Sequence, residues 1–120
     1  MRGYVNKNGE SQPNYHYEDL AHLNDTYIRM GLANPSVVVD CNHSNSDKNY
    51  KAQVRIAKEV CHNRQHSKSI NSLVKGLMIE SYLEDGAQNI DEGIFGKSIT
   101  DPCIGWARTE KLILDIADLV

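Results

Sequence analysis

The residues best suited to chemistry follow two short apolar runs. His43 lies just beyond the run 37–39, and Glu80 directly follows the run 77–79. A third candidate, Asp101, lies in a glycine-containing stretch further along the chain. Active sites of parallel α/β folds gather at the carboxyl ends of strands, so we expect these three side chains to converge. One imidazole and two carboxylates suit a divalent metal of the Mn, Fe, Co or Zn class.

The same residues also allow less specific interpretations. Asp40 could cap the segment that follows its strand, and His43 could be an ordinary loop histidine. Scattered ligands lack the compact spacing of a zinc motif, so spacing alone leaves both interpretations open. Gly96-Lys97-Ser98 resembles the tail of a phosphate-binding loop, but the rest of the Walker spacing is absent and we reject that motif.

Two strands and three helices are predicted to position these side chains. The strands are Ser36–Cys41 and Leu73–Ile79, the second interrupted only by Lys75 and Gly76. Such apolar runs are typical of parallel strands buried on both faces. One helix is predicted over Tyr15–Met30. The other two follow from apolar residues at helical spacing, which are Tyr50, Val54, Ala57 and Cys61 for the second helix, and Leu112, Ile113, Ile116, Leu119 and Val120 for the third. The second helix is predicted to end in the polar stretch 62–69, and residues 2–14 and 84–104 are predicted loops.

The order of these elements predicts parallel βαβ units of an α/β fold. Two strands do not make a stable sheet alone, because their faces and edges need covering. A complete (β/α)₈ barrel needs about 250 residues, and this chain has 120. We therefore expect residues 1–120 to form a single partial domain, a piece of a larger one.

Composition and charge narrow the class of protein. Hydrophobic content of 40% and charged content of 24% are typical of globular chains. The net charge of −3 argues against a nucleic-acid partner. No apolar run approaches the roughly 18–20 residues of a membrane span, and the first residues lack the apolar stretch of a signal peptide. We therefore expect neither a membrane partner nor export.

The three cysteines, Cys41, Cys61 and Cys103, are an odd number without close pairing. This indicates a reducing compartment, and we expect a cytoplasmic protein. Free cysteine behaves mostly as a small buried hydrophobe, so we assign these thiols no chemistry.

Four blocks of sequence resemble a known family in order and approximate separation. They are 40–48 (DCNHSNSDK), 79–83 (IESYL), 96–106 (GKSITDPCIGW), and Arg2-Gly3 followed by Pro13-Asn14-Tyr15. Together they resemble the class I 3-deoxy-D-arabino-heptulosonate 7-phosphate (DAHP) synthases, and the similarity covers essentially the whole chain. The block that ends at Trp106 is the most specific.

The resemblance implies the C-terminal part of a (β/α)₈ TIM barrel, from about the sixth helix to the eighth. The two predicted strands would then be the seventh and eighth, and the barrel would be incomplete. The family condenses phosphoenolpyruvate with erythrose 4-phosphate, the first step of the shikimate pathway to chorismate and the aromatic amino acids.

Carried over by motif, His43, Glu80 and Asp101 match the divalent-metal ligands of the family. His43 and Asp101 are thereby the implied catalytic residues. Arg2 matches an arginine that binds phosphoenolpyruvate, a role suited to the bidentate grip of a guanidinium on phosphate. His43 is implied at the substrate as well as at the metal.

The resemblance also implies that part of the active site lies elsewhere. The fourth metal ligand of the family, a cysteine, and its Lys-Pro-Arg-Thr segment belong to the N-terminal part of the barrel, and none of the three cysteines here matches that motif. We therefore expect weak metal binding or an empty site, and no activity from this chain alone.

Two alternatives to a synthase fragment remain at this point. One is a non-catalytic truncated fragment that folds by self-association. The other is a synthase for an eight-carbon phosphorylated sugar acid on the same barrel, which the block 97–106 argues against. Whichever interpretation holds, the strands 37–41 and 77–80 would have unpaired edges in an incomplete barrel. Such edges tend to pair with another chain, so we expect a homo-oligomer.

Overall fold

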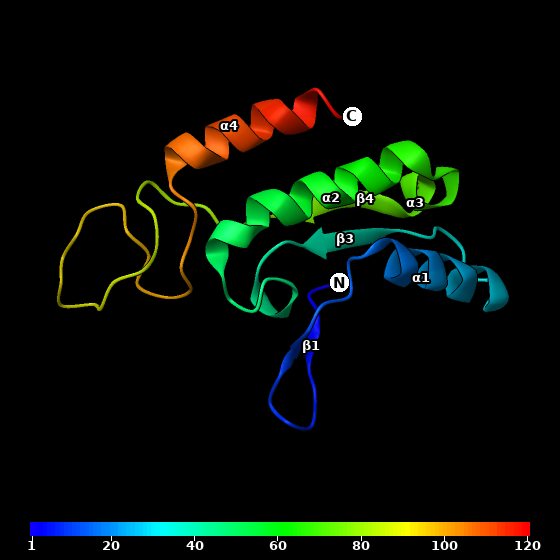
Figure 1. Cartoon of the computed structure of the whole chain (residues 1–120), viewed down its shortest axis with the longest axis horizontal. Helices are drawn as coiled ribbons and strands as arrows, with labels where there is room; N and C mark the ends of the chain where they lie inside the picture. Colours follow the sequence, from blue (N-terminus) through cyan, green and yellow to red (C-terminus); the bar gives the residue numbers. More distant parts are fainter.

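Two parallel strands, β3 (Val37–Asp40) and β4 (Val74–Met78), form the sheet that carries the candidate site (Figure 1). The β-branched valines of β3 favour an extended chain. Asp40 pairs with Met78, so both strands end at the same edge of the sheet. In the computed structural model, which describes residues 1–120, this sheet and a small hairpin are the two sheets of an α/β arrangement that does not close into a barrel.

Four α-helices and two short 3₁₀ helices complete the regular structure. They are α1 (Tyr17–Arg29), α2 (Gln53–His66), α3 (Lys68–Leu73), α4 (Trp106–Ala117), η1 (His43–Asn45) and η2 (Tyr50–Ala52). The principal core joins the strands to the helices through Tyr15, Leu20, Val39, Cys41, Ile56, Ala57, Val60, Ile70, Val74, Ile104 and Leu112.

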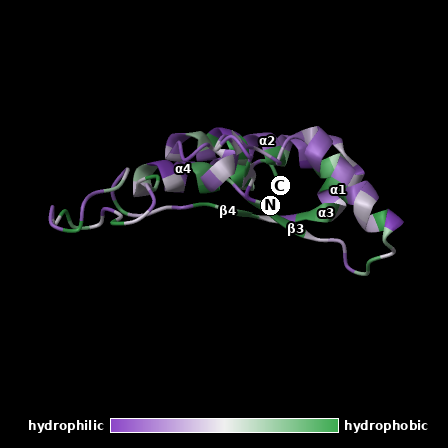
Figure 2. Cartoon of the chain, turned by 90° about the horizontal axis from the view of Figure 1, so that it is seen from below, coloured by the Kyte–Doolittle hydropathy of each residue, from purple (hydrophilic) through white to green (hydrophobic).

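The helices cover only one face of the sheet. Figure 2 shows α2 and α4 on one side of β3 and β4, with no element on the other side. The chain measures 51 × 39 × 21 Å along its principal axes. Because one helix is about 10–12 Å across, the shortest dimension has room for one layer of helices and one sheet. Side chains alternate between the faces of a strand. Val39 is fully buried under the helices, whereas Val38 is 51% exposed on the uncovered side. We call this side, which carries Val38, Gly76 and Met78, the bare face.

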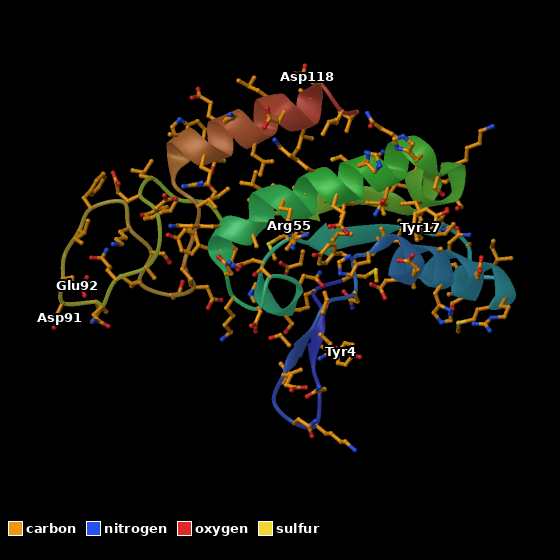
Figure 3. All side chains as sticks on the ribbon, viewed as in Figure 1. Tyr4, Tyr17, Arg55, Asp91, Glu92 and Asp118 are labelled. Carbon is orange, nitrogen blue, oxygen red and sulfur yellow. The ribbon has the colours of Figure 1, made fainter.

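The N-terminal segment lies along the free edge of β3. The Met1 amino group donates to the Val38 carbonyl (2.6 Å), and the Asp40 amide donates to the Met1 carbonyl (2.8 Å). A hairpin of β1 (Tyr4–Val5) and β2 (Ser11–Gln12) follows and extends away from the helices, with the Tyr4 side chain at its side (Figure 3).

Residues 79–105 form a long loop without helix or extended strand, which contains the predicted loop 84–104. Asp91 and Glu92 mark its far end, well away from the helices (Figure 3). Phe95, in the same loop, is 87% exposed.

The parallel strands and the helices α1, α2 and α4 confirm the predicted order, but several details of the prediction were wrong. The strands are not buried on both faces, because there is no third layer. The segment predicted as an opening loop contains the hairpin. The polar stretch 62–69 does not lead directly into a strand: the Ser67 hydroxyl accepts from the Ile70 amide (3.4 Å) and begins α3.

The C-terminal helix also differs from its prediction. It ends at Ala117, before Leu119 and Val120, and Ile113 is 52% exposed, so these three residues do not share one buried helical face with Leu112. None of the helices has the length and apolar character needed to cross a membrane.

Candidate metal centre

The side chains of His43, Glu80 and Asp101 meet at the carboxyl edge of the sheet. His43 Nε2 lies 3.2 Å from Glu80 Oε1 and 3.4 Å from Asp101 Oδ2. One donor atom from each of the three residues lies within 4.8 Å of the other two. The structure therefore brings together the three residues that the sequence singled out, and we call them the three-ligand cluster.

His43 reaches the cluster from a backbone conformation that is uncommon outside glycine. Its φ is 48°, in the left-handed region, which costs about 1–2 kcal/mol for an L-residue. The turn fixes this conformation, because the His43 carbonyl accepts from the Lys48 amide at 2.9 Å. On the ring, Nδ1 lies 2.8 Å from Asp40 Oδ2, so both nitrogens of His43 face carboxylates.

Glu80 is held through its backbone by the buried side chain of Gln53. Gln53, on α2, has no exposed surface. Its Oε1 accepts from the Glu80 amide (2.7 Å), and its Nε2 donates to the Glu80 carbonyl (3.1 Å). Since β4 ends at Met78, Glu80 has no strand partner of its own. These two bonds fix its backbone and thereby the position from which its carboxylate extends.

Asp101 is positioned by the return of the long loop past the end of β4. The Ile104 amide donates to the Glu80 carbonyl (3.1 Å), and the Tyr82 amide donates to the Ile104 carbonyl (3.0 Å). Cys103 and Gly86 exchange a further pair of backbone hydrogen bonds. The loop thereby folds back beside the strand end and brings Asp101 next to Glu80.

Arg2 lies at the same edge, outside the three-ligand cluster. Its Nε is 4.0 Å from Asp40 Oδ2, and its side chain is 64% exposed. The pairing of Met1 with β3 places it there, and the exposure of its side chain leaves the guanidinium accessible from solvent.

A hollow of about 500 Å³ lies beside the cluster without containing any of its three residues. Ser81 and Thr100, the sequence neighbours of Glu80 and Asp101, line it together with Lys97 and Ser98. The hollow therefore offers hydroxyl groups and one cation next to the candidate site.

The three cysteines are free and buried, as predicted, and none of them joins the cluster. Burial raises the pKa of the Cys41 thiol to about 12, and the negative charge of Asp40 adds to this shift. Burial also raises the pKa of Cys61 and of Cys103. All three thiols are therefore protonated at neutral pH and are poor nucleophiles or ligands as they stand.

The donor set fits a divalent cation. Two ligand atoms about 2.1 Å from one ion lie roughly 3.0–3.4 Å apart at octahedral to tetrahedral angles, and the two distances from His43 Nε2 are 3.2 and 3.4 Å. One nitrogen and two oxygen donors belong to the Mn, Fe, Co and Zn class. Asp40 adds a third carboxylate behind the ring, which increases the local negative charge.

Two residues of the site, Asp40 and Gln53, were missed from the sequence. Asp40 was weighed only as a cap, although a carboxylate three residues before His43 at the end of the same strand was an available signal. Gln53 gave no local signal, because it contacts Glu80 only through the packing of α2 on the sheet.

Comparisons with known proteins agree with the sequence resemblance. A model of the DAHP synthetase I family matches residues 4–113. The Trp-sensitive phospho-2-dehydro-3-deoxyheptonate aldolase of Enterobacter agglomerans is 38% identical, over 98% of this chain and 34% of the relative. The phospho-2-dehydro-3-deoxyheptonate aldolase of Haemophilus influenzae is 35% identical, over 95% of this chain and 31% of the relative.

A solved structure shows the same correspondence. The structure of phospho-2-dehydro-3-deoxyheptonate aldolase from Francisella tularensis matches with a TM-score of 0.82 at 30% identity, covering 92% of this chain and 31% of that one. The chain therefore spans about a third of the length of the curated relatives it matches.

Proposed function

Because this chain belongs to the DAHP synthetase I family, we propose that it is the C-terminal part of a 3-deoxy-7-phosphoheptulonate synthase. The proposed reaction is the condensation of phosphoenolpyruvate with erythrose 4-phosphate. The convergence of His43, Glu80 and Asp101 on one point is the observation that carries the proposal. As the chain spans about a third of its relatives, the reaction is proposed for the barrel that these residues help to form.

In this proposal His43 Nε2 and the carboxylates of Glu80 and Asp101 hold the metal ion. An ion of the Mn, Fe, Co or Zn class supplies Lewis-acid polarisation of the aldehyde oxygen or activation of water. Asp101, whose side chain is 46% exposed, is accessible to orient the sugar phosphate. Arg2 binds the phosphate of phosphoenolpyruvate through its exposed guanidinium, and His43 borders both the metal and the substrate.

We propose that residues 1–120 are a single partial domain, with β3 and β4 as the seventh and eighth strands of a TIM barrel. The bare face would then line the barrel interior. The free cysteines support a cytoplasmic location, because free thiols are typical of reducing compartments.

The bare face and the outer edge of β4, which no strand pairs, support a second candidate, a non-catalytic fragment that folds by self-association. Val38 is 51% exposed on that face, and no other element covers it. We propose a homo-oligomer under either candidate, since such a face is buried more favourably against a second copy than against water.

The metal centre is tested by calorimetry of this chain with Mn²⁺. Since three of the expected ligands come together here, we expect weak binding that Glu80→Ala reduces at least tenfold. Glu84→Ala, a change at an exposed acid of the same loop, is the matched control and should leave the affinity unchanged. Tight binding that Glu80→Ala does not diminish would mean that the ion is held elsewhere.

Catalysis is tested by phosphate release from phosphoenolpyruvate in the presence of erythrose 4-phosphate and Mn²⁺. We expect no release from the isolated chain, because one arginine and three metal ligands do not enclose two phosphorylated substrates. Turnover at an ordinary enzyme rate, about 1–1,000 per second, would instead show that the isolated chain is catalytically sufficient.

A further inference from the structure

We propose that Asp40 is a positioning residue that sets the tautomer and the orientation of His43. The inference rests on the metal centre proposed above and deepens it. Asp40 Oδ2 lies 2.8 Å from His43 Nδ1, whereas the nearer of the two carboxylates at Nε2, that of Glu80, has its Oε1 3.2 Å away. With its proton on Nδ1, the ring keeps a lone pair on Nε2, and that lone pair faces the three-ligand cluster.

The environment of Asp40 favours this assignment. The Asp40 side chain is 8% exposed, compared with 22% for Glu80 and 46% for Asp101. Hydrogen bonds to a charged group are stronger where water is excluded. Asp40 therefore attracts the imidazole proton more strongly than the two carboxylates at Nε2.

Both carboxylate oxygens of Asp40 are used, so replacing either one by an NH₂ group should disturb the hydrogen bonds around His43. Asp40 Oδ1 accepts from the Asn42 amide at 2.8 Å, so both oxygens act as acceptors. Asp40→Asn retains only one oxygen. If that oxygen stays on the Asn42 amide, the new NH₂ group faces His43 Nδ1 and forces the proton onto Nε2, the nitrogen that must bind the ion.

The alternative orientation of the new side chain is also unfavourable. An amide turned the other way would direct its NH₂ group at the Asn42 N–H, and two donors would then face each other in a buried site. The ring of His43 has little room for a compensating movement, since its side chain is only 18% exposed and lies against carboxylates at both nitrogens.

The test measures tautomer and metal affinity separately. Long-range ¹H–¹⁵N spectra of the metal-free chain in alkaline buffer report which nitrogen of His43 holds the proton. We expect Nδ1–H in the wild type and Nε2–H in Asp40→Asn. Calorimetry should show Mn²⁺ binding about 10–100-fold weaker in the variant, the usual effect of losing a partner behind a ligating histidine.

Glu59→Gln is the matched control, because Glu59 Oε1 lies 2.7 Å from His16 Nδ1, away from the cluster. It removes a carboxylate from a histidine pair and should leave Mn²⁺ affinity unchanged. Wild-type His43 with its proton on Nε2, or an Asp40→Asn chain of undiminished affinity, would overturn the proposal.

The wild-type spectrum needs no variant, so it remains decisive if Asp40→Asn does not fold. A wild-type Nδ1–H tautomer without measurable Mn²⁺ binding would support the orienting role of Asp40 while rejecting the proposed metal centre. The two proposals therefore fail separately.

Discussion

Asp85 connects the long loop to the start of α4 through both of its carboxylate oxygens. Oδ1 accepts from the Gly105 amide (2.6 Å), and Oδ2 accepts from Arg108 Nη2 (3.3 Å). The bond from the Gly105 backbone is the main cause that lowers the pKa of Asp85, and Arg108 adds to it. The charged form is thereby favoured at a helix N-terminus, where the macrodipole is positive.

This lowered pKa predicts a pH dependence of stability. Because the folded pKa lies below the unfolded value of about 3.9, the contribution of Asp85 is fully present above that value and is lost as the pH falls through the folded pKa. The side chain is 42% exposed, so we expect the contribution to stay below about 1 kcal/mol. Asp85→Asn should lower the melting temperature by a few degrees at neutral pH.

Thermal melts from neutral to acidic pH measure this effect. The wild-type and Asp85→Asn curves should approach each other as the pH falls below 3.9, the unfolded value. Asp91→Asn, at the far end of the same loop, is the control and should follow the wild type throughout. A constant gap between wild type and Asp85→Asn at every pH would contradict the electrostatic explanation.

At the scale of single residues, the sequence predicted the three members of the candidate site but not the residues that hold them in place. His43 and Glu80 follow short apolar runs, and the ends of parallel strands meet at one edge. Asp101 was singled out in the glycine-containing stretch after the second strand, but its approach to Glu80 depends on how the loop returns. Asp40 and Gln53 contact His43 and Glu80 only in the folded chain, so their roles could not be predicted from the sequence pattern.

At the scale of elements, Gln53 joins α2 to the end of β4. The Glu80 amide has Gln53 Oε1 as its hydrogen-bond partner, and the Gln53 side chain is fully buried. Gln53→Met retains the length of the side chain but leaves that amide unsatisfied. We therefore expect a loss of about 1–3 kcal/mol in the free energy of unfolding, together with weaker Mn²⁺ binding, because Glu80 loses its support.

Urea denaturation and calorimetry measure the two effects. Gln65→Met is the matched control on the same helix: Gln65 Nε2 donates to the Leu119 carbonyl (2.9 Å) at an exposed position. It should cost no more than about 0.5 kcal/mol and should not change metal affinity. Equal losses in both variants would show that Gln53 has no special role at the strand end.

The elements that were predicted correctly are those with a long or strongly apolar pattern, such as α1 and the valine run of β3. The missed ones are short. The strands of the hairpin have two residues each, and α3 begins in a polar stretch where a serine cap decides the outcome. Local periodicity is too weak a signal over so few residues.

At the scale of the whole molecule, the covered and uncovered faces of the sheet have different environments. Val39 packs under the helices with no exposed surface, whereas Val38 is 51% exposed on the bare face. Asp40 and Glu80 share the bare side by the alternation of strand residues, so the candidate site lies at one end of that face. The prediction of a partial domain rested on the same feature, because a sheet of only two strands leaves faces and edges uncovered.

The bare face predicts self-association of the isolated chain. A second copy that packs its own bare face against the first would bury Val38 and Met78 on both copies, in an interface with two-fold symmetry. We expect light scattering at low micromolar concentration to report a dimer, and Val38→Glu to shift it to monomer, because the dimer would bury an unpaired carboxylate. Ile28→Glu, at a position on α1 that is 70% exposed, should leave the dimer intact. A stable, compact wild-type monomer would show that neither the bare face nor the strand edges drive association in solution.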